Sequence, residues 1–190
     1  MSDFEFVFIL YALILGLSLI ELLTGMGKAL ELKFAADAGD KSFTIGWLTP
    51  ALAVFVLLDL LSFWIFAWRV RDAMVVSPPS LLAVMAFASA YFLAARMVFP
   101  SDPARFADLD THYFRVRRLV MAILIALVGF QWLYLLLSLD NVNVLLTPVS
   151  VVMTLVLVAL MAAAMWVRSV RANFAILVLL ILRYLVIYLL

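Results

Sequence analysis

Residues 144–167 read VLLTPVSVVMTLVLVALMAAAMWV, an apolar run without a single charged side chain. A helix of about 20 apolar residues crosses a bilayer core about 30 Å thick, so this stretch is long enough to span a membrane. Five further stretches have the same length and character. We therefore predict an all-α, polytopic membrane protein with six transmembrane helices, the other five being residues 4–26, 47–69, 79–99, 118–138 and 173–190.

The composition of the 190-residue chain agrees with this prediction. Hydrophobic residues make up 69% of it and charged residues 13%, whereas soluble domains are about half apolar. The two longest predicted connections, residues 27–46 and 100–117, are too short to form soluble domains, because chains below about 40 residues rarely bury enough core. We predict a single transmembrane domain over residues 1–190.

Composition also excludes several classes of function. Without cysteine the chain has no disulfide, thiol nucleophile or iron–sulfur cluster. The single histidine, His112, falls in a predicted connection, so this chain alone cannot supply a bis-histidine haem site. A net charge of +1 argues against nucleic acid as a partner, because binding phosphates needs a basic surface. No nucleotide-binding or hydrolase motif is present, so we expect neither an enzyme nor a cofactor.

Basic residues predict the orientation. Six spans return the chain to its starting side, where two basic residues, Arg69 and Arg71, lie between spans. The opposite side carries nine, and the excess of Lys and Arg in short loops marks the cytoplasmic side. Both termini are therefore expected outside. The nine residues are Lys28, Lys33, Lys41, Arg105, Arg115, Arg117, Arg118, Arg168 and Arg171.

Two spans open with the same three residues. Leu-Thr-Pro occurs at 48–50 and at 146–148, and each copy is followed by a tryptophan, Trp68 or Trp166, at the same distance. This similarity favours a duplicated unit with halves 1–100 and 101–190. Because three spans per copy would invert the second copy, the halves would form an inverted repeat, an architecture that recurs in secondary transporters.

Several ionisable or polar side chains fall at membrane depth, where they are costly and typical of interior or functional positions. Counting about 1.5 Å per residue, Asp59, Gln131 and Arg183 fall near the middle of the bilayer. Glu21 and Arg96 share a second layer nearer the cytoplasm. We predict two ion pairs, Asp59–Arg183 and Glu21–Arg96, because unpaired charges there would neutralise or draw water in.

The same residues allow three interpretations. The pairs can serve only to hold the helices in register, or Asp59 and Gln131 can line an ion or proton path, or a pair can form between copies in a homo-oligomer. Two serines support the second interpretation, because Ser18 shares a helix face with Glu21 and Ser62 shares one with Asp59. Candidate path residues are thus Asp59, Gln131, Arg183, Glu21, Arg96, Ser18 and Ser62.

The connection before the fourth span combines carboxylates with a basic segment. Asp102 precedes Pro103, a pattern typical of a capped helix start, and Asp108 to Thr111 offers a second cap. The spacing expected for a calcium or zinc site is missing, so we predict no metal. Arg115, Arg117 and Arg118 follow at the inner headgroup level, where arginines bind anionic lipids.

Residues 109–118 (LDTHYFRVRR) and 16–23 (GLSLIELL) resemble a family of small bacterial six-span integral membrane proteins that has no established activity. The resemblance implies a bacterial inner-membrane location and assigns no functional residue.

Two functions remain as hypotheses. The first is a small channel or transporter that passes an ion, a proton or a small solute between the two halves. The second is a non-catalytic scaffold or regulatory subunit of a larger membrane complex. The first suits the polar residues at the midplane, and the second suits a short chain with minimal loops. Expected partners are the bilayer with its anionic lipids and a second copy or another membrane protein.

Overall fold

The computed structural model describes residues 3–37, 43–71, 76–138 and 147–189. These residues form six α-helices and a short 3-10 helix. All six α-helices are long and apolar enough to span a membrane, which confirms the predicted all-α, six-span fold. The helices are α1 (Asp3–Asp37), α2 (Leu48–Arg69), α3 (Pro78–Val98), η2 (Pro103–Arg105), α4 (Leu109–Ser138), α5 (Pro148–Trp166) and α6 (Val170–Leu189).

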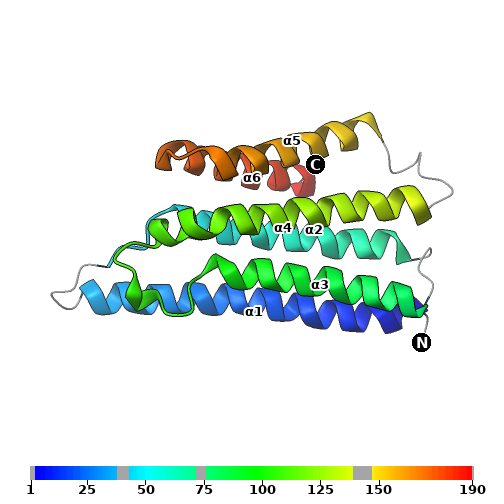
Figure 1. Ribbon diagram of the computed structural model, residues 1–190, viewed down its shortest axis with the longest axis horizontal. Coiled ribbons are helices and arrows are strands. Elements are labelled where there is room, and N and C mark those ends of the chain that lie inside the picture. Colours follow the sequence, from blue (N-terminus) through cyan, green and yellow to red (C-terminus); the bar gives the residue numbers. More distant parts are fainter. Residues whose placement is uncertain (1–2, 38–42, 72–75, 139–146, 190) are drawn as a thin grey trace.

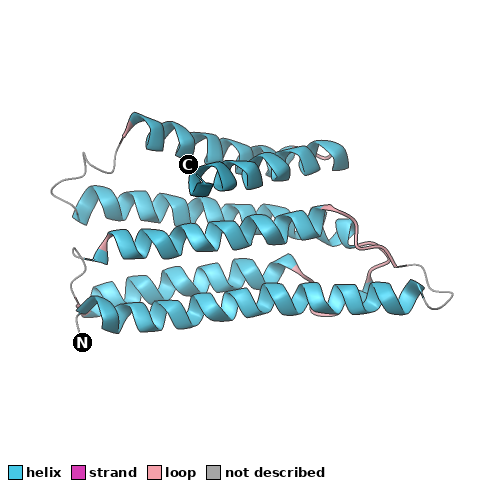
Figure 2. Cartoon of the chain, turned by 180° about the vertical axis from the view of Figure 1, so that it is seen from behind, coloured by secondary structure: helices cyan, strands magenta, loops and turns pink. Residues whose placement is uncertain are grey.

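The helices stack as three neighbouring pairs, and successive helices along the chain run in opposite directions (Figure 1). One outer pair is α1 with α3, the middle pair is α2 with α4, and the other outer pair is α5 with α6 (Figure 2). The α5–α6 hairpin packs on the middle pair through α6 on α2 and α5 on α4. The middle pair is therefore covered on both sides, and buried side chains concentrate on α2 and α4.

Helix starts follow from local sequence. Ser77 caps α3 in a reciprocal arrangement with Ser80, and Thr147 caps α5 by accepting from the Ser150 amide at 3.1 Å. Each of these caps is followed by proline, which tolerates the first helical position because it has no amide hydrogen to leave unpaired. The predicted cap at Asp102 is confirmed, since its carboxylate accepts from the Ala104 amide at 3.2 Å.

Two predicted boundaries were wrong. Helix α1 continues eleven residues past the predicted end at residue 26, and α4 begins at Leu109 instead of residue 118. Residues beyond the apolar run can remain helical when their polar groups pair along the helix, as Lys33 and Asp37 do at 2.6 Å. His112, expected in a connection, consequently lies inside the first turns of α4.

The starts of α2 and α4 are joined to each other. The Thr44 amide donates to the Ala107 carbonyl at 3.0 Å, and the Thr44 carbonyl accepts from the Leu109 amide at 3.2 Å. Asp110 then caps α2 by accepting from the Leu48 amide at 3.0 Å. Gly46 has a φ of +67°, and a Cβ there would collide with the Asp110 carboxylate. This junction fixes the middle pair of helices at one end of the bundle.

The two Leu-Thr-Pro segments have different structural roles. Thr49 lies inside α2 and donates to the Leu109 carbonyl at 2.9 Å, whereas Thr147 is the cap that precedes α5. Leu146 lies outside the described residues. Helix pairing differs between the halves as well, because α1 packs extensively on α3 while α4 makes at most marginal contact with α6. The packing of the described residues therefore gives no support to a repeat.

Two glycines of α1 provide a matched test of the α1–α3 contact. A Cβ at Gly25 would lie 2.6 Å from the Cβ of Phe99, whereas a Cβ at Gly27 meets nothing within 4 Å. We expect Gly25→Ala to lower the free energy of unfolding by about 1–3 kcal/mol through overpacking. Gly27→Ala should raise it by up to about 1 kcal/mol, since alanine favours the helix. Thermal unfolding in mild detergent measures both, and equal effects of the two changes would contradict the close approach.

Candidate functional site

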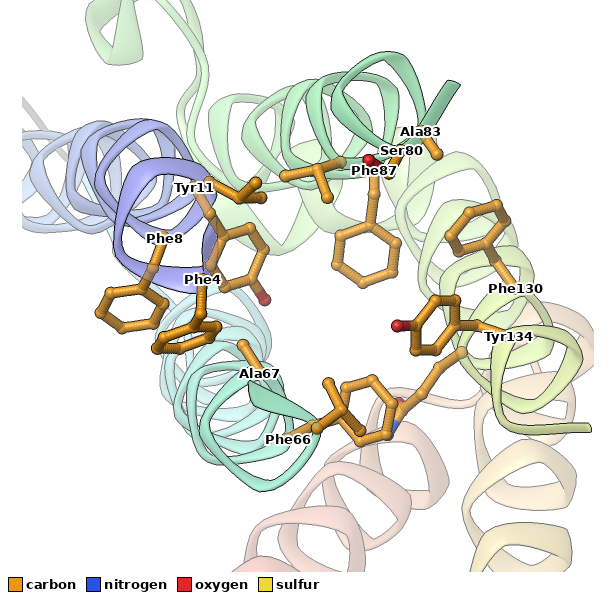
Figure 3. A pocket seen from close by; sticks show the side chains of 14 residues that line it. Phe4, Phe8, Tyr11, Phe66, Ala67, Ser80, Ala83, Phe87, Phe130 and Tyr134 are labelled. Carbon is orange, nitrogen blue, oxygen red and sulfur yellow. The ribbon is translucent and has the colours of Figure 1, made fainter. Parts of the chain in front are cut away.

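Helices α1 to α4 enclose a cavity of about 270 Å³ at the end of the bundle where the chain begins (Figure 3). It is partly enclosed, and half of its 14 lining residues are phenylalanines or tyrosines. None of these 14 carries a charge. The lining residues come from segments 4–11, 66–70, 80–87 and 130–134.

Three polar side chains in the cavity make no hydrogen bond to any described residue. They are Tyr11 on α1 and Gln131 and Tyr134 on α4. The hydroxyl groups of Tyr11 and Tyr134 point into the cavity from opposite sides (Figure 3). Tyr11 is only 7% exposed. Gln131 and Tyr134 are half-buried, so the cavity offers three hydrogen-bonding groups to an occupant.

Asp59 lies behind this cavity, halfway along α2, and is 1% exposed. Its Oδ1 accepts a hydrogen bond from the Tyr184 hydroxyl of α6 at 2.5 Å, while its Oδ2 accepts none. Two further buried tyrosines, Tyr11 and Tyr91, lie near Asp59. Tyr91 also donates to the Val56 carbonyl at 2.5 Å. Asp59 is thus surrounded by phenol groups from three different helices.

The predicted Asp59–Arg183 ion pair is wrong in its geometry. In the described part of the chain no cationic nitrogen lies within 4.0 Å of the Asp59 carboxylate. Arg183 and Tyr184 are adjacent on α6, so their side chains leave the helix about 100° apart and only one can face Asp59. Tyr184 faces it. Arg183 turns to α5, where its Nε donates to the Met153 carbonyl at 3.0 Å, and its guanidinium lies 4.9 Å from the Tyr184 ring centre.

Tyr11 connects the cavity with the Asp59 layer. It lines the cavity and also lies within reach of the Asp59 charge. Elsewhere the Phe63 ring lies between the cavity and the Asp59 cluster. Its centre is 4.9 Å from the ring centre of Phe87, which lines the cavity, and 5.6 Å from that of Tyr91, which lies near Asp59. A polar group therefore links the two regions at Tyr11, and an aromatic wall divides them at Phe63.

The remaining path candidates lie apart from this cluster. The predicted Glu21–Arg96 pair is present at 3.3 Å, with both side chains more than a third exposed. Ser18 is fully buried and donates to the Ile14 carbonyl of its own helix at 3.0 Å. Ser62 is half-buried beside Tyr188. The structure thus brings Asp59 and Ser62 to the α2–α6 contact and Gln131 to the cavity, and it leaves Glu21, Arg96 and Ser18 farther along the bundle.

The prediction that Arg117 binds lipid headgroups is wrong, because Arg117 is only 3% exposed. Its Nη1 donates to the Ala164 carbonyl at 2.7 Å, to the Val167 carbonyl, and to Asn173 Oδ1 at 3.1 Å. Tyr113 donates to the same Asn173 oxygen at 2.9 Å. The unpaired carbonyls at the end of α5 attract a cation, so Arg117 clips the α5–α6 hairpin to α4.

Arg115 and Arg118 remain available to lipid. Both are exposed, with Arg115 over the Phe106 ring and Arg118 over the Trp166 ring, each at 5.5 Å. Lys41, another of the predicted cytoplasmic cations, lies outside the described residues.

Tyr11, Tyr91, Tyr134 and the phenylalanines of the cavity were missed by sequence reasoning. A signal was present, because residues that line the cavity recur three or four positions apart at one end of each of the four helices, as in Phe4, Phe8 and Tyr11. Periodicity alone does not distinguish such a face from ordinary core.

Comparison with known proteins found no matching family model, no similar curated protein and no similar solved structure. The described residues also hold no group of three His, Cys, Asp or Glu side chains that could bind a metal. The site is therefore argued from its own geometry.

The Asp59–Tyr184 contact can be measured with a double-mutant cycle. Residues in contact show non-additive effects, so we expect Asp59→Asn and Tyr184→Phe to couple by about 1 kcal/mol in the free energy of unfolding. Tyr113→Phe, which removes a phenol hydroxyl at the Arg117 clip, serves as the control. Its effect on the free energy of unfolding and that of Asp59→Asn should sum, in the double variant, to within about 0.5 kcal/mol. Unfolding titrations with SDS in mixed micelles supply the values. Additive losses for Asp59 and Tyr184 would contradict the contact.

Proposed function

We propose that this protein is a small membrane transporter that passes a small solute, an ion or a proton across the bilayer. In this proposal the cavity of α1 to α4 is the entrance from the side of the termini, and the Asp59 cluster is the mid-membrane site behind it. The observation that carries the proposal is the cavity with three polar groups that make no hydrogen bond to a described residue, one of them, Tyr11, near a buried carboxylate. Intramembrane ionisable residues of this kind mark solute and proton paths.

The opposite half of the bundle supports a transporter over an open channel. On the Arg117 side of Asp59, the described interior is closely packed with side chains that are at most 1% exposed, including the polar Ser18, Thr49 and Asn173. Alternating access requires a site that is reachable from one side while the other side is closed, and this arrangement fits such a state. The apolar side chains include Leu15, Leu52, Val56, Ala95, Leu124 and Leu177.

We further propose that the chain lies in a bacterial inner membrane with both termini outside. Among the described residues, the predicted cytoplasmic cations gather at the end that holds η2, and Arg69 and Arg71 lie at the other end. Short loops rich in Lys and Arg stay in the cytoplasm.

The orientation is testable because the native chain has no cysteine, so a single introduced cysteine reports alone. We expect a cysteine at Arg71 to react with a membrane-impermeant maleimide added to intact spheroplasts. A cysteine at Ser101, in the connection beside η2, should react only after lysis. The reverse pattern would invert the proposed orientation.

Transport is testable by the same labelling without knowledge of the solute. Ala83 lines the cavity and Ala95, 1% exposed, lies one turn beyond Tyr91 on α3. For a transporter, Ala83→Cys should react from the outer side, and Ala95→Cys should react from the cytoplasmic side when the inward-facing state forms. Ala164→Cys is the control, because Ala164 is equally buried but lies beside the Arg117 clip. It should stay unreactive from both sides.

Two outcomes would overturn the proposal. If Ala95→Cys stays as unreactive as Ala164→Cys, the inner half does not open, and the alternative of a scaffold or regulatory subunit is favoured. If Ala83→Cys and Ala95→Cys each react from both sides at once, the protein is a channel.

A further inference from the structure

The inference concerns the solute class of the cavity and deepens the proposed function on which it rests. We propose that the cavity binds a small, uncharged aromatic molecule that carries a hydroxyl or carbonyl group. Charge, ring geometry, unpaired polar groups and size each restrict the ligand.

The absence of charge at the site excludes ions as ligands of the cavity itself. None of the described lining residues is charged, and moving an unpaired ion into such a site is strongly unfavourable. Arg69 lies within the segment 66–70 and Arg71 just beyond it, but both are exposed and neither lines the cavity, and Arg71 engages the Trp68 ring at 4.9 Å. A neutral ligand meets no such cost.

The aromatic lining favours a flat ring. Aromatic pairs prefer edge-to-face or offset arrangements with ring centres 4.5–7 Å apart. Phe87 illustrates the available faces, because its ring centre lies 6.3 Å from that of Tyr11 and 5.8 Å from that of Phe130. Figure 3 shows Phe66, Phe87 and Phe130 arranged around the same space as the hydroxyl groups of Tyr11 and Tyr134. A ring placed there would contact several π faces.

The unpaired polar groups favour a ligand with its own hydrogen-bonding atom over a lipid chain. Tyr11, Gln131 and Tyr134 supply two hydroxyl groups and a carboxamide, which can donate to a carbonyl and donate to or accept from a hydroxyl. An acyl chain would leave all three without a partner, and for the buried Tyr11 an unpaired hydroxyl is costly.

Size limits the ligand to one or two rings. An engineered apolar cavity of about 150 Å³ holds benzene, and drug-sized ligands occupy about 300–1,000 Å³. A cavity of about 270 Å³ lies between these values. Naphthalene derivatives are therefore suitable probes.

Three probes separate the requirements. We would measure binding of 1-naphthol, naphthalene and 1-naphthoate to the full chain in lipid nanodiscs by equilibrium dialysis against protein-free nanodiscs. The wild type should bind 1-naphthol about three- to tenfold more tightly than naphthalene, as one hydrogen bond allows. It should bind 1-naphthoate more weakly than either. Equal or tighter binding of 1-naphthoate would overturn the inference.

Matched variants assign the binding to this cavity. Tyr134→Phe and Tyr11→Phe should each lower 1-naphthol affinity about three- to tenfold and leave naphthalene affinity unchanged. Ala83→Phe, which fills the cavity, should abolish binding of both. Ala86→Phe adds the same ring to the same helix at an exposed position outside the cavity and should change neither. Binding that is insensitive to Ala83→Phe, or a copurified lipid that 1-naphthol does not displace, would overturn the inference.

The 1-naphthol binding measurement and the Ala95→Cys labelling measurement test the ligand class and the transport proposal separately. Binding as expected together with an unreactive Ala95→Cys would leave the ligand class standing and remove transport. A reactive Ala95→Cys without 1-naphthol binding would leave transport standing with another class of solute.

Discussion

Every polar group inside this bundle must find its partner within the protein, because the hydrocarbon core of a bilayer offers no water. Most buried polar side chains satisfy this constraint within the protein, although Asp59 Oδ2, Arg117 Nε and Arg183 Nη1 have no partner among the described residues. Asp59 receives the Tyr184 hydroxyl, Tyr91 donates to the Val56 carbonyl, and Arg117 donates to the carbonyls that end α5. Tyr11, Gln131 and Tyr134 make no hydrogen bond to a described residue, and Gln131 and Tyr134 are half-buried, so the cavity presents three hydrogen-bonding groups that the fold itself does not use.

The fold consists of a four-helix unit with a hairpin attached to it. Helices α1 to α4 build the cavity, and the α5–α6 hairpin packs on α2 and α4. Polar contacts fix the hairpin at two levels, chiefly the Arg117 clip at the η2 end and the Asp59–Tyr184 bond halfway along α2, with Tyr188 donating to the Leu58 carbonyl beside it. The clip explains why a basic residue in a basic segment is buried. Its guanidinium donates to carbonyls at the end of α5, while its neighbours Arg115 and Arg118 are exposed.

Sequence reasoning reached the six-span fold because hydropathy and span length act locally along the chain. Depth counting also matched Glu21 with Arg96, since counting along two helices needs no knowledge of rotation. It failed for Arg183, because residues at one depth still face different directions and Tyr184 takes the inward direction. The cavity was missed for a related reason. Four aromatic faces meet only through tertiary packing, and each face alone looks like ordinary core.

Asp59 lies between the α5–α6 hairpin and the wall of the cavity. Its carboxylate bonds to Tyr184 of the hairpin. One of its oxygens has no hydrogen-bond partner among the described residues. Tyr11 lines the cavity and lies near the carboxylate that Tyr184 of α6 contacts, and this proximity is the physical reason to treat the cavity and Asp59 as one site.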